Sequence, residues 1–179
     1  MRITVSGTPG SGKTSASKML ARELNLRYYG LGEMIRKTAV KKGVSLIKFT
    51  EYLETHKLYN KKFNDSIKKL NSEDNFVLDS RIGVLLIKDS VNIFLDSDPG
   101  IRAERIFRDK RKLESFETIG DVKKEILKRL EIEKKMIYEL YKFDFTDPKH
   151  YDIAIDTTGM NVRKIYNIAK RYLRKGGFL

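Results

Sequence analysis

The sequence predicts an α/β fold, in which helices flank a parallel five-stranded sheet. Four short runs rich in valine, isoleucine and phenylalanine show little polar–apolar alternation, as expected for strands covered on both faces. Helical patterns separate these runs, so strands and helices alternate along the chain. The four runs span residues 2–6, 75–80, 91–97 and 151–157, and residues 26–30 form a less regular fifth strand.

The length and composition indicate one globular domain. A chain of 179 residues can build a sizeable core with modest insertions. With 40% hydrophobic and 34% charged residues, it fits neither a disordered nor a membrane protein. No apolar run approaches the roughly 18 residues that span a bilayer. With no signal-peptide pattern at the start, the cytoplasm is the expected compartment. The absence of cysteine excludes disulfides and thiolate catalysis.

The first strand runs directly into a glycine-rich motif, "GTPGSGKTS", which a helical pattern over residues 13–24 follows. Gly7, Gly12, Lys13 and Thr14 satisfy G-x-x-x-x-G-K-[ST]. Glycines let the backbone N–H groups turn toward phosphate oxygens, and the helix N-terminus adds its positive end. Lys13 is expected to neutralise the β- and γ-phosphates, and the Thr14 hydroxyl to hold Mg²⁺. The sequence thus predicts a three-layer P-loop fold, with nucleotide bound by Gly7, Thr8, Pro9, Gly10, Ser11, Gly12, Lys13, Thr14 and Ser15.

Two segments exceed what a minimal sheet-and-helix core needs. Residues 31–71 are almost entirely helical in pattern, and residues 109–120 are polar and lack periodicity. A long helix, which we expect Asp121 to open, follows the second segment. Two flaps that exclude water are typical of a small kinase, and no N-K-x-D guanine motif occurs. The predicted core comprises residues 1–30, 72–108 and 121–179.

An acceptor that carries a phosphate needs cations of its own. Arg36 lies in "GLGEMIRK", and "LDSRIG" places Asp79 and Arg81 at the carboxyl end of a central strand, where ligands of such sheets gather. Arginine binds a phosphate through two parallel hydrogen bonds, which lysine cannot do. Asp79 is a candidate to orient Mg²⁺-bound water or to accept a hydrogen bond from a base. Ordinary surface ion pairs remain the alternative for Arg36 and Arg81.

These motifs resemble those of the archaeal-type cytidylate kinases, which are P-loop nucleoside monophosphate kinases. The resemblance covers almost the whole chain and continues through "IRAERIFRDK", "EILKRLEIEKKMIYELY" and "YDIAIDT". It implies transfer of the γ-phosphoryl group of ATP to CMP and dCMP, with Mg²⁺, giving ADP and CDP. It also implies small-molecule substrates rather than nucleic acid or a membrane as partners, and a monomer is expected.

The resemblance assigns roles to both insertions and to several charged residues. Residues 31–71 would be the monophosphate-binding insertion, and residues 109–120 the lid over ATP. Arg36 matches the arginine that grips the acceptor phosphate, and Asp79 and Arg81 match a pair near the acceptor. The implied catalytic residues are Lys13, Arg81 and Arg129, the lid-side nucleotide ligands Arg105 or Arg108, and the metal ligands Thr14 and Asp79.

Two positions depart from the family pattern. The family has a second arginine seven residues after the position of Arg129, where this chain has Met136. Lys134 or Lys135 is a candidate to supply the missing charge, without an arginine's fork. Before "GEMIR" the family often has a serine, and here the residue is Gly30. This puts the selectivity for the base in doubt.

Other interpretations stay open at this point. The chain could be a kinase acting on AMP, UMP or a non-nucleotide alcohol such as shikimate. A hydroxyl acceptor would need a base, for which Asp79 is the candidate. The net charge of +13 would also suit a nucleic-acid-associated ATPase, although no RNA-binding signature is present. A member of the fold that binds nucleotide without turnover is a third possibility.

Several polar and aromatic residues are not expected to carry chemistry. His56 and His150 are isolated among polar neighbours and are expected at the surface. Glu131, Glu133 and Glu139 show no metal-ligand spacing and are expected on a solvated helix face. Tyr28 and Tyr29 are expected in the strand core.

Overall fold

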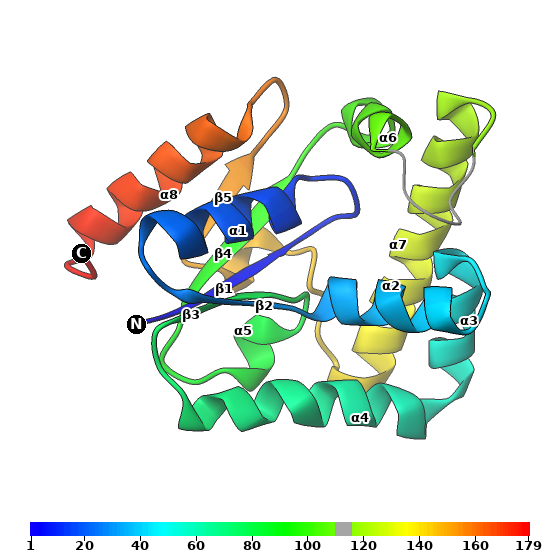
Figure 1. Ribbon diagram of the computed structural model, residues 1–179, viewed down its shortest axis with the longest axis horizontal. Coiled ribbons are helices and arrows are strands. Elements are labelled where there is room, and N and C mark those ends of the chain that lie inside the picture. Colours follow the sequence, from blue (N-terminus) through cyan, green and yellow to red (C-terminus); the bar gives the residue numbers. More distant parts are fainter. Residues whose placement is uncertain (110–115) are drawn as a thin grey trace.

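All five predicted strands form one parallel sheet. The computed structural model describes residues 1–109 and 116–179, apart from the side chains of residues 57, 59 and 60. The strand order is β2-β3-β1-β4-β5, so β1 (Arg2–Gly7) lies at the centre (Figure 1). The other strands are β2 (Arg27–Gly30), β3 (Phe76–Asp79), β4 (Val91–Asp96) and β5 (Ile153–Asp156). Each neighbouring pair is parallel.

Helices cover both faces of this sheet and extend past its carboxyl edge. They are α1 (Lys13–Glu23), α2 (Leu31–Lys41), α3 (Leu46–Thr55), α4 (Lys57–Lys68), α5 (Gly83–Leu86), α6 (Pro99–Arg108), α7 (Ile119–Tyr141) and α8 (Val162–Lys175). Two 3₁₀ turns complete the described elements, η1 (Lys69–Ser72) and η2 (Pro148–His150).

Two hydrophobic clusters, one on each face of the sheet, hold the helices against it and so give the fold three layers. On one face, α1 and α8 pack on the sheet through Leu20 and Leu173 against Val5 and Leu95. On the other face, β3 packs against α4, η1 and α7, and Phe76 lies at the centre of that cluster. Burial of such side chains contributes about 1.5–3 kcal/mol each. The predicted three-layer α/β fold is confirmed.

The first insertion is helical throughout, as the sequence predicts, and it packs against α7. Figure 1 shows α2 and α3 beside the long helix α7. Ala39, Phe49 and Leu53 form a small core of their own, against which Met136 of α7 packs. Two ion pairs also join α3 to α7, Glu51–Lys128 at 2.6 Å and Glu54–Lys135 at 2.7 Å. Half of the predicted lid, residues 110–115 of 109–120, lies outside the described residues.

Helix α7 begins earlier than predicted. Its first residue is Ile119, not Asp121, and Thr118 is its N-cap. The Thr118 hydroxyl accepts a hydrogen bond from the Asp121 N–H at 3.1 Å, and the Asp121 carboxylate accepts one from the Thr118 N–H at 3.1 Å. This reciprocal capping box satisfies N–H groups that have no partner inside the helix. Asp121 therefore closes the cap from inside the first turn.

Candidate functional site

The phosphate loop connects β1 to α1 and is curled around the Thr8 carbonyl. That oxygen accepts hydrogen bonds from the Ser11 hydroxyl at 2.9 Å and from Lys13 Nζ at 2.7 Å. Gly10 and Gly12 have φ angles of +84° and +90°, which side chains rarely adopt. Lys13 is the first residue of α1, so the loop ends at the positive end of that helix. This is an anion-binding arrangement built from backbone groups.

Neighbouring elements leave no room for side chains at two of the glycines. A Cβ at Gly7 would overlap the carbonyl oxygen of Leu95, and one at Gly10 would lie 2.7 Å from the carbonyl oxygen of Arg102. Arg102 is buried in α6, and its guanidinium approaches the Pro9 carbonyl at 3.5 Å. Arg102 was missed at the sequence level, because nothing in the motif shows that α6 supports the loop.

The two predicted metal ligands lie together. Asp79 ends β3 beside β1, and its carboxylate accepts a hydrogen bond from the Thr14 hydroxyl at 2.7 Å. Both groups are oxygen donors, which suit Mg²⁺, an ion that keeps several waters and completes its shell with substrate phosphates. Among residues 1–109 and 116–179, no group of three or more His, Asp or Glu residues could hold a metal by itself. The two oxygen donors fit part of a Mg²⁺ shell that phosphates and water would complete.

Lys13 is half-buried at this site, and desolvation together with the nearby Arg81 destabilises its charge. Burial, followed by repulsion from Arg81, lowers the pKa of Lys13 to about 7, although Asp79 and Glu133 act in the opposite direction. A phosphate group bound in the loop would restore the charge. A phosphate in the loop would therefore favour protonation of the Lys13 amine.

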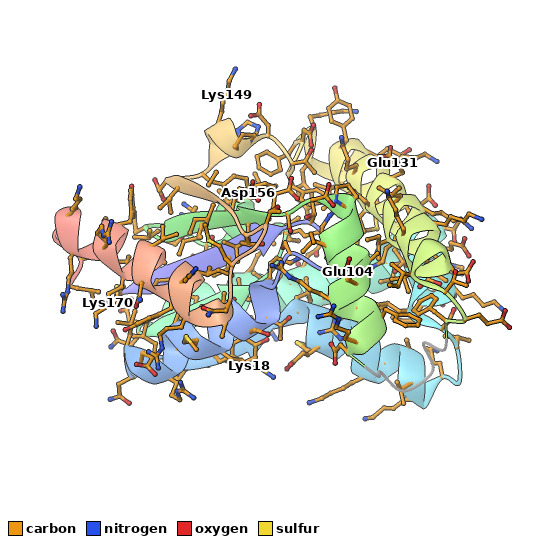
Figure 2. The ribbon with its side chains drawn as sticks, turned by 90° about the horizontal axis from the view of Figure 1, so that it is seen from above. Lys18, Glu104, Glu131, Lys149, Asp156 and Lys170 are labelled. Carbon is orange, nitrogen blue, oxygen red and sulfur yellow. The ribbon has the colours of Figure 1, made fainter. Side chains whose placement is uncertain are left out.

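A buried carboxylate holds two of the predicted arginines. Glu133 forms an ion pair with Arg81 at 2.8 Å, and its other oxygen accepts a hydrogen bond from Arg129 Nε at 3.0 Å. Glu133 is only 5% exposed, so the expectation that it lies on a solvated face is wrong. Its neighbours Glu131 and Glu139 are exposed as expected, and Figure 2 shows Glu131 on the outer side of α7. The i, i+4 spacing of Arg129 and Glu133 was the signal available in the sequence.

The other predicted cations lie in different surroundings. Arg36 of α2 lines the cavity described below, with its guanidinium over Gly32. Arg105 lines it too and binds the Thr157 and Met160 carbonyls at 2.7 and 3.2 Å, which ties α6 to the loop after β5. Arg108 is exposed and pairs with Glu104 at 3.5 Å. Of the two lid-side candidates, the structure therefore brings Arg105 to the site.

The structure shows the surroundings of Met136 and Gly30, the two residues that depart from the family pattern. Met136 lines the cavity as an apolar residue, whereas Lys134 and Lys135 pair with Asp144 and Glu54 away from it. The Tyr28 hydroxyl occupies the space that a Cβ at Gly30 would need. That hydroxyl is buried, and burial together with the nearby Asp79 raises its pKa.

One cavity, of about 450 Å³, brings these residues together at the carboxyl edge of the sheet. The phosphate loop, Arg105, Met160 and Ile165 line one part of it. Beyond Lys13 and Thr14 it continues between the first insertion and α7, where Arg36, Arg81 and Arg129 line it. Nine-tenths or more of Arg129 and Glu133 is buried. The cavity can therefore hold two anionic groups, one on each side of Lys13.

Comparison with known protein families shows to which family this chain belongs. Residues 2–159 match the model of the cytidylate kinase-like family. The chain belongs to the cytidylate kinase-like family. Among curated relatives, the cytidylate kinase of Methanocaldococcus jannaschii is 32% identical over 173 residues, covering 94% of each chain. That of Sulfurisphaera tokodaii is 32% identical and covers 97% of this chain and 95% of the relative. A full-length match to several such enzymes makes this protein a kinase.

Solved structures agree on the fold. Shikimate kinase from Acinetobacter baumannii superposes with a TM-score of 0.62 at 17% identity, covering 98% of this chain and 93% of that one. A gluconokinase from Sinorhizobium meliloti 1021 gives a TM-score of 0.61 at 17% identity, covering 97% and 91%. These likenesses establish the P-loop kinase fold.

The remaining residues singled out in the sequence lie outside the cavity. His56 is exposed and stacks on Tyr52, and His150 is exposed beside Phe143. Tyr29 packs edge-on against Phe76, and Tyr28 packs on the core beneath α1, as expected of strand residues. None of the described helices is both long and apolar enough to cross a bilayer.

Proposed function

We propose that this kinase transfers the γ-phosphoryl group of ATP to CMP and dCMP, giving ADP and the corresponding diphosphate. The observation that carries the proposal is the pair of anion sites flanking Lys13, the backbone loop on one side and the arginines on the other. The family match and the names of the archaeal relatives support cytidylate as the acceptor.

The reaction needs positioning and charge neutralisation. An oxygen of the acceptor phosphate attacks the γ-phosphorus of ATP, a new P–O bond forms, and the bond to the β–γ bridging oxygen breaks. The acceptor oxygen is already anionic, so no strong base is required. Lys13 neutralises the charge that develops between the two phosphates, and Arg81 and Arg129 stabilise the equatorial oxygens. Glu133 holds both guanidinium groups in place.

Mg²⁺ would be held by Thr14 and Asp79 together with the phosphates of ATP. When bound, it neutralises charge on the β- and γ-phosphates. Asp79 is already bonded to the Thr14 hydroxyl, which favours a metal-side role over that of a base for a hydroxyl acceptor. The arginines beyond Lys13 likewise favour a phosphate acceptor over shikimate.

The remaining assignments belong to the same proposal. Residues 31–71 bind the acceptor and residues 109–120 act as the lid over ATP. The enzyme works in the cytoplasm as a monomer on small nucleotides, and nucleic acid is not a partner.

Two substitutions test the roles of the two anion sites. Lys13→Ala should lower kcat by about 10²–10³-fold, because it removes a cation from the transition state.

Arg36→Ala should raise KM for CMP by at least about tenfold, with KM for ATP within about twofold of wild type. Lys37→Ala is the matched control, since Lys37 is the exposed neighbour of Arg36 on α2. Equal effects of Arg36→Ala on both KM values would contradict the assignment.

A further inference from the structure

The cavity ends in a wall whose chemistry differs from the rest. Past the arginines, the first insertion and the C-terminal half of α7 enclose a space that is mainly apolar. We call this the distal wall, formed by Leu53, Phe63, Asn64, Met136, Leu140 and Tyr141. A flat, weakly polar ring fits such surroundings, and a second phosphate would not. On the proposed function, this is where the base of the acceptor would lie.

Two side chains of the distal wall carry uncharged polar groups. Asn64 of α4 donates a hydrogen bond from its amide nitrogen to the hydroxyl of Tyr141, the last residue of α7, at 2.7 Å. Figure 1 shows α4 passing beside this end of α7. Asn64 is only 5% exposed, although an asparagine this deep in a protein is costly unless its polar atoms are bonded. Burial also raises the pKa of Tyr141, so its hydroxyl stays protonated.

This pair leaves hydrogen-bonding capacity unused. An asparagine amide has two N–H donors and a carbonyl oxygen with two lone pairs. Among the described side chains, which leave out those of residues 57, 59 and 60, the bond to Tyr141 is the single side-chain hydrogen bond of Asn64, and its carbonyl oxygen receives none. Because the Tyr141 oxygen accepts from Asn64, its own O–H remains a donor. The distal wall therefore presents one acceptor beside one donor.

In this arrangement the Asn64 acceptor and the Tyr141 donor are complementary to the polar edge of cytosine and not to that of uracil. Cytosine carries an exocyclic amino donor beside a ring-nitrogen acceptor. Uracil presents a carbonyl acceptor beside a ring N–H donor, so it pairs with these groups only if the Asn64 amide flips and the hydrogen bond between Asn64 and Tyr141 reverses. A site with buried polar atoms rejects a ligand that leaves them unpaired.

We propose that Asn64 and Tyr141 select the acceptor base. The Asn64 carbonyl accepts from the amino group of cytosine, and the Tyr141 hydroxyl donates to the adjacent ring nitrogen. The inference rests on the proposed function, because it assumes a nucleoside monophosphate beyond Lys13. It assigns the choice between cytosine and uracil to a contact between α4 and α7, in the same wall as Met136 and not at Gly30.

The test is a kinetic comparison of CMP with UMP at saturating ATP, in wild type, Asn64→Leu and Tyr141→Phe. Loss of one buried hydrogen-bond partner weakens binding of the matching base by about 10–100-fold. The ratio of kcat/KM for CMP to kcat/KM for UMP should therefore fall by at least about tenfold in each variant. KM for ATP should stay within about twofold. Tyr138→Phe is the control, since Tyr138 is an exposed tyrosine on the same helix.

A modified substrate sharpens the test. A CMP analogue that lacks the 4-amino group should be a poor acceptor for wild type, and Asn64→Leu should treat CMP and the analogue almost alike. An unchanged CMP-to-UMP ratio in Tyr141→Phe would overturn the inference, whether or not Asn64→Leu folds. Failure of wild type to phosphorylate CMP at all would overturn the proposed function itself. Turnover of CMP with an unchanged CMP-to-UMP ratio in the variants would instead overturn only the role of Asn64 and Tyr141.

Discussion

Glu133 shows how one residue can organise two others from distant parts of the chain. Arg81 follows β3 and Arg129 belongs to α7, yet both contact the same buried carboxylate. Without it, the two guanidinium groups would repel each other and Lys13, with Asp79 as the countercharge left nearby. A buried ion pair adds little net stability, but removal of one partner is costly.

Glu133→Gln should therefore destabilise the nucleotide-free protein by about 3 kcal/mol. It should also lower kcat/KM for the acceptor, because both guanidinium groups lose their positions. Thermal unfolding and initial rates measure the two effects. Glu131→Gln is the matched control, an exposed glutamate two residues earlier on the same helix. Identical melting temperatures for the two variants would contradict the role of Glu133.

The lowered pKa of Lys13 predicts proton uptake on binding. In the free protein this pKa is about 7 instead of 10.5, so between those values the unfolded chain binds more protons than the folded one. The contribution of Lys13 to stability therefore rises with pH across that window. Bound phosphate favours the charged amine, so at pH 8 ATP binding should take up as much as about one proton. Calorimetry in two buffers of different ionisation enthalpy measures this, and a buffer-independent enthalpy would refute it.

Sequence reasoning at the residue scale worked where the chemistry is local. The motif predicted the phosphate loop, and the strand end predicted that Asp79 and Arg81 would lie at the ligand-binding edge of the sheet. The spacing of Arg129 and Glu133 indicated an ion pair on one helix, but not its burial, because Arg81 comes to α7 only through the tertiary fold. Asn64 was missed for the same reason, since its partner lies 77 residues away.

At the scale of elements, the strands were predictable because burial on both faces removes the alternation of polar residues. The start of α7 was predicted two residues late. Its capping box uses aspartate where glutamate or glutamine is usual, so the signal was weaker than the standard pattern. The consequence is that Thr118, rather than Asp121, supplies the cap for a 23-residue helix that carries Arg129 and Glu133.

Thr118→Ala should lower the free energy of unfolding by about 1 kcal/mol, or about 2–4 °C in melting temperature. The comparison is Ser45→Ala, which removes the cap of α3. Its hydrogen bond from Lys48 N–H is long, 3.4 Å, so a smaller loss is expected. Thermal melts of both variants measure the difference. A Thr118→Ala melt that coincides with wild type would show that the capping box contributes nothing.

For the whole molecule, the net charge of +13 is distributed over the surface instead of forming one tail. Figure 2 shows nitrogen-tipped side chains on several sides, with Lys149 at the top of the view, Lys170 at its left and Lys18 at its lower edge. Such a field attracts nucleotides over a distance that salt shortens, about 10 Å at 0.1 M and 3 Å at 1 M.

Raising KCl from 50 to 500 mM should therefore lower kcat/KM for both substrates severalfold, while kcat changes little. The reason is that steering acts on encounter, whereas the phosphates in the cavity are shielded from solvent. Steady-state kinetics with each substrate varied in turn measure the effect. A kcat/KM that does not respond to salt would show that the surface charge has another role.

The central claim is that the arginines beyond Lys13 receive the phosphate of a cytidine nucleotide. The most direct measurement is the initial rate of ADP formation from Mg·ATP with CMP, dCMP, UMP, AMP, GMP and shikimate, beside a blank without acceptor. We expect turnover with CMP and dCMP well above that with the other acceptors and in the blank. Preference for another acceptor, or ATP hydrolysis that no acceptor accelerates, would contradict it.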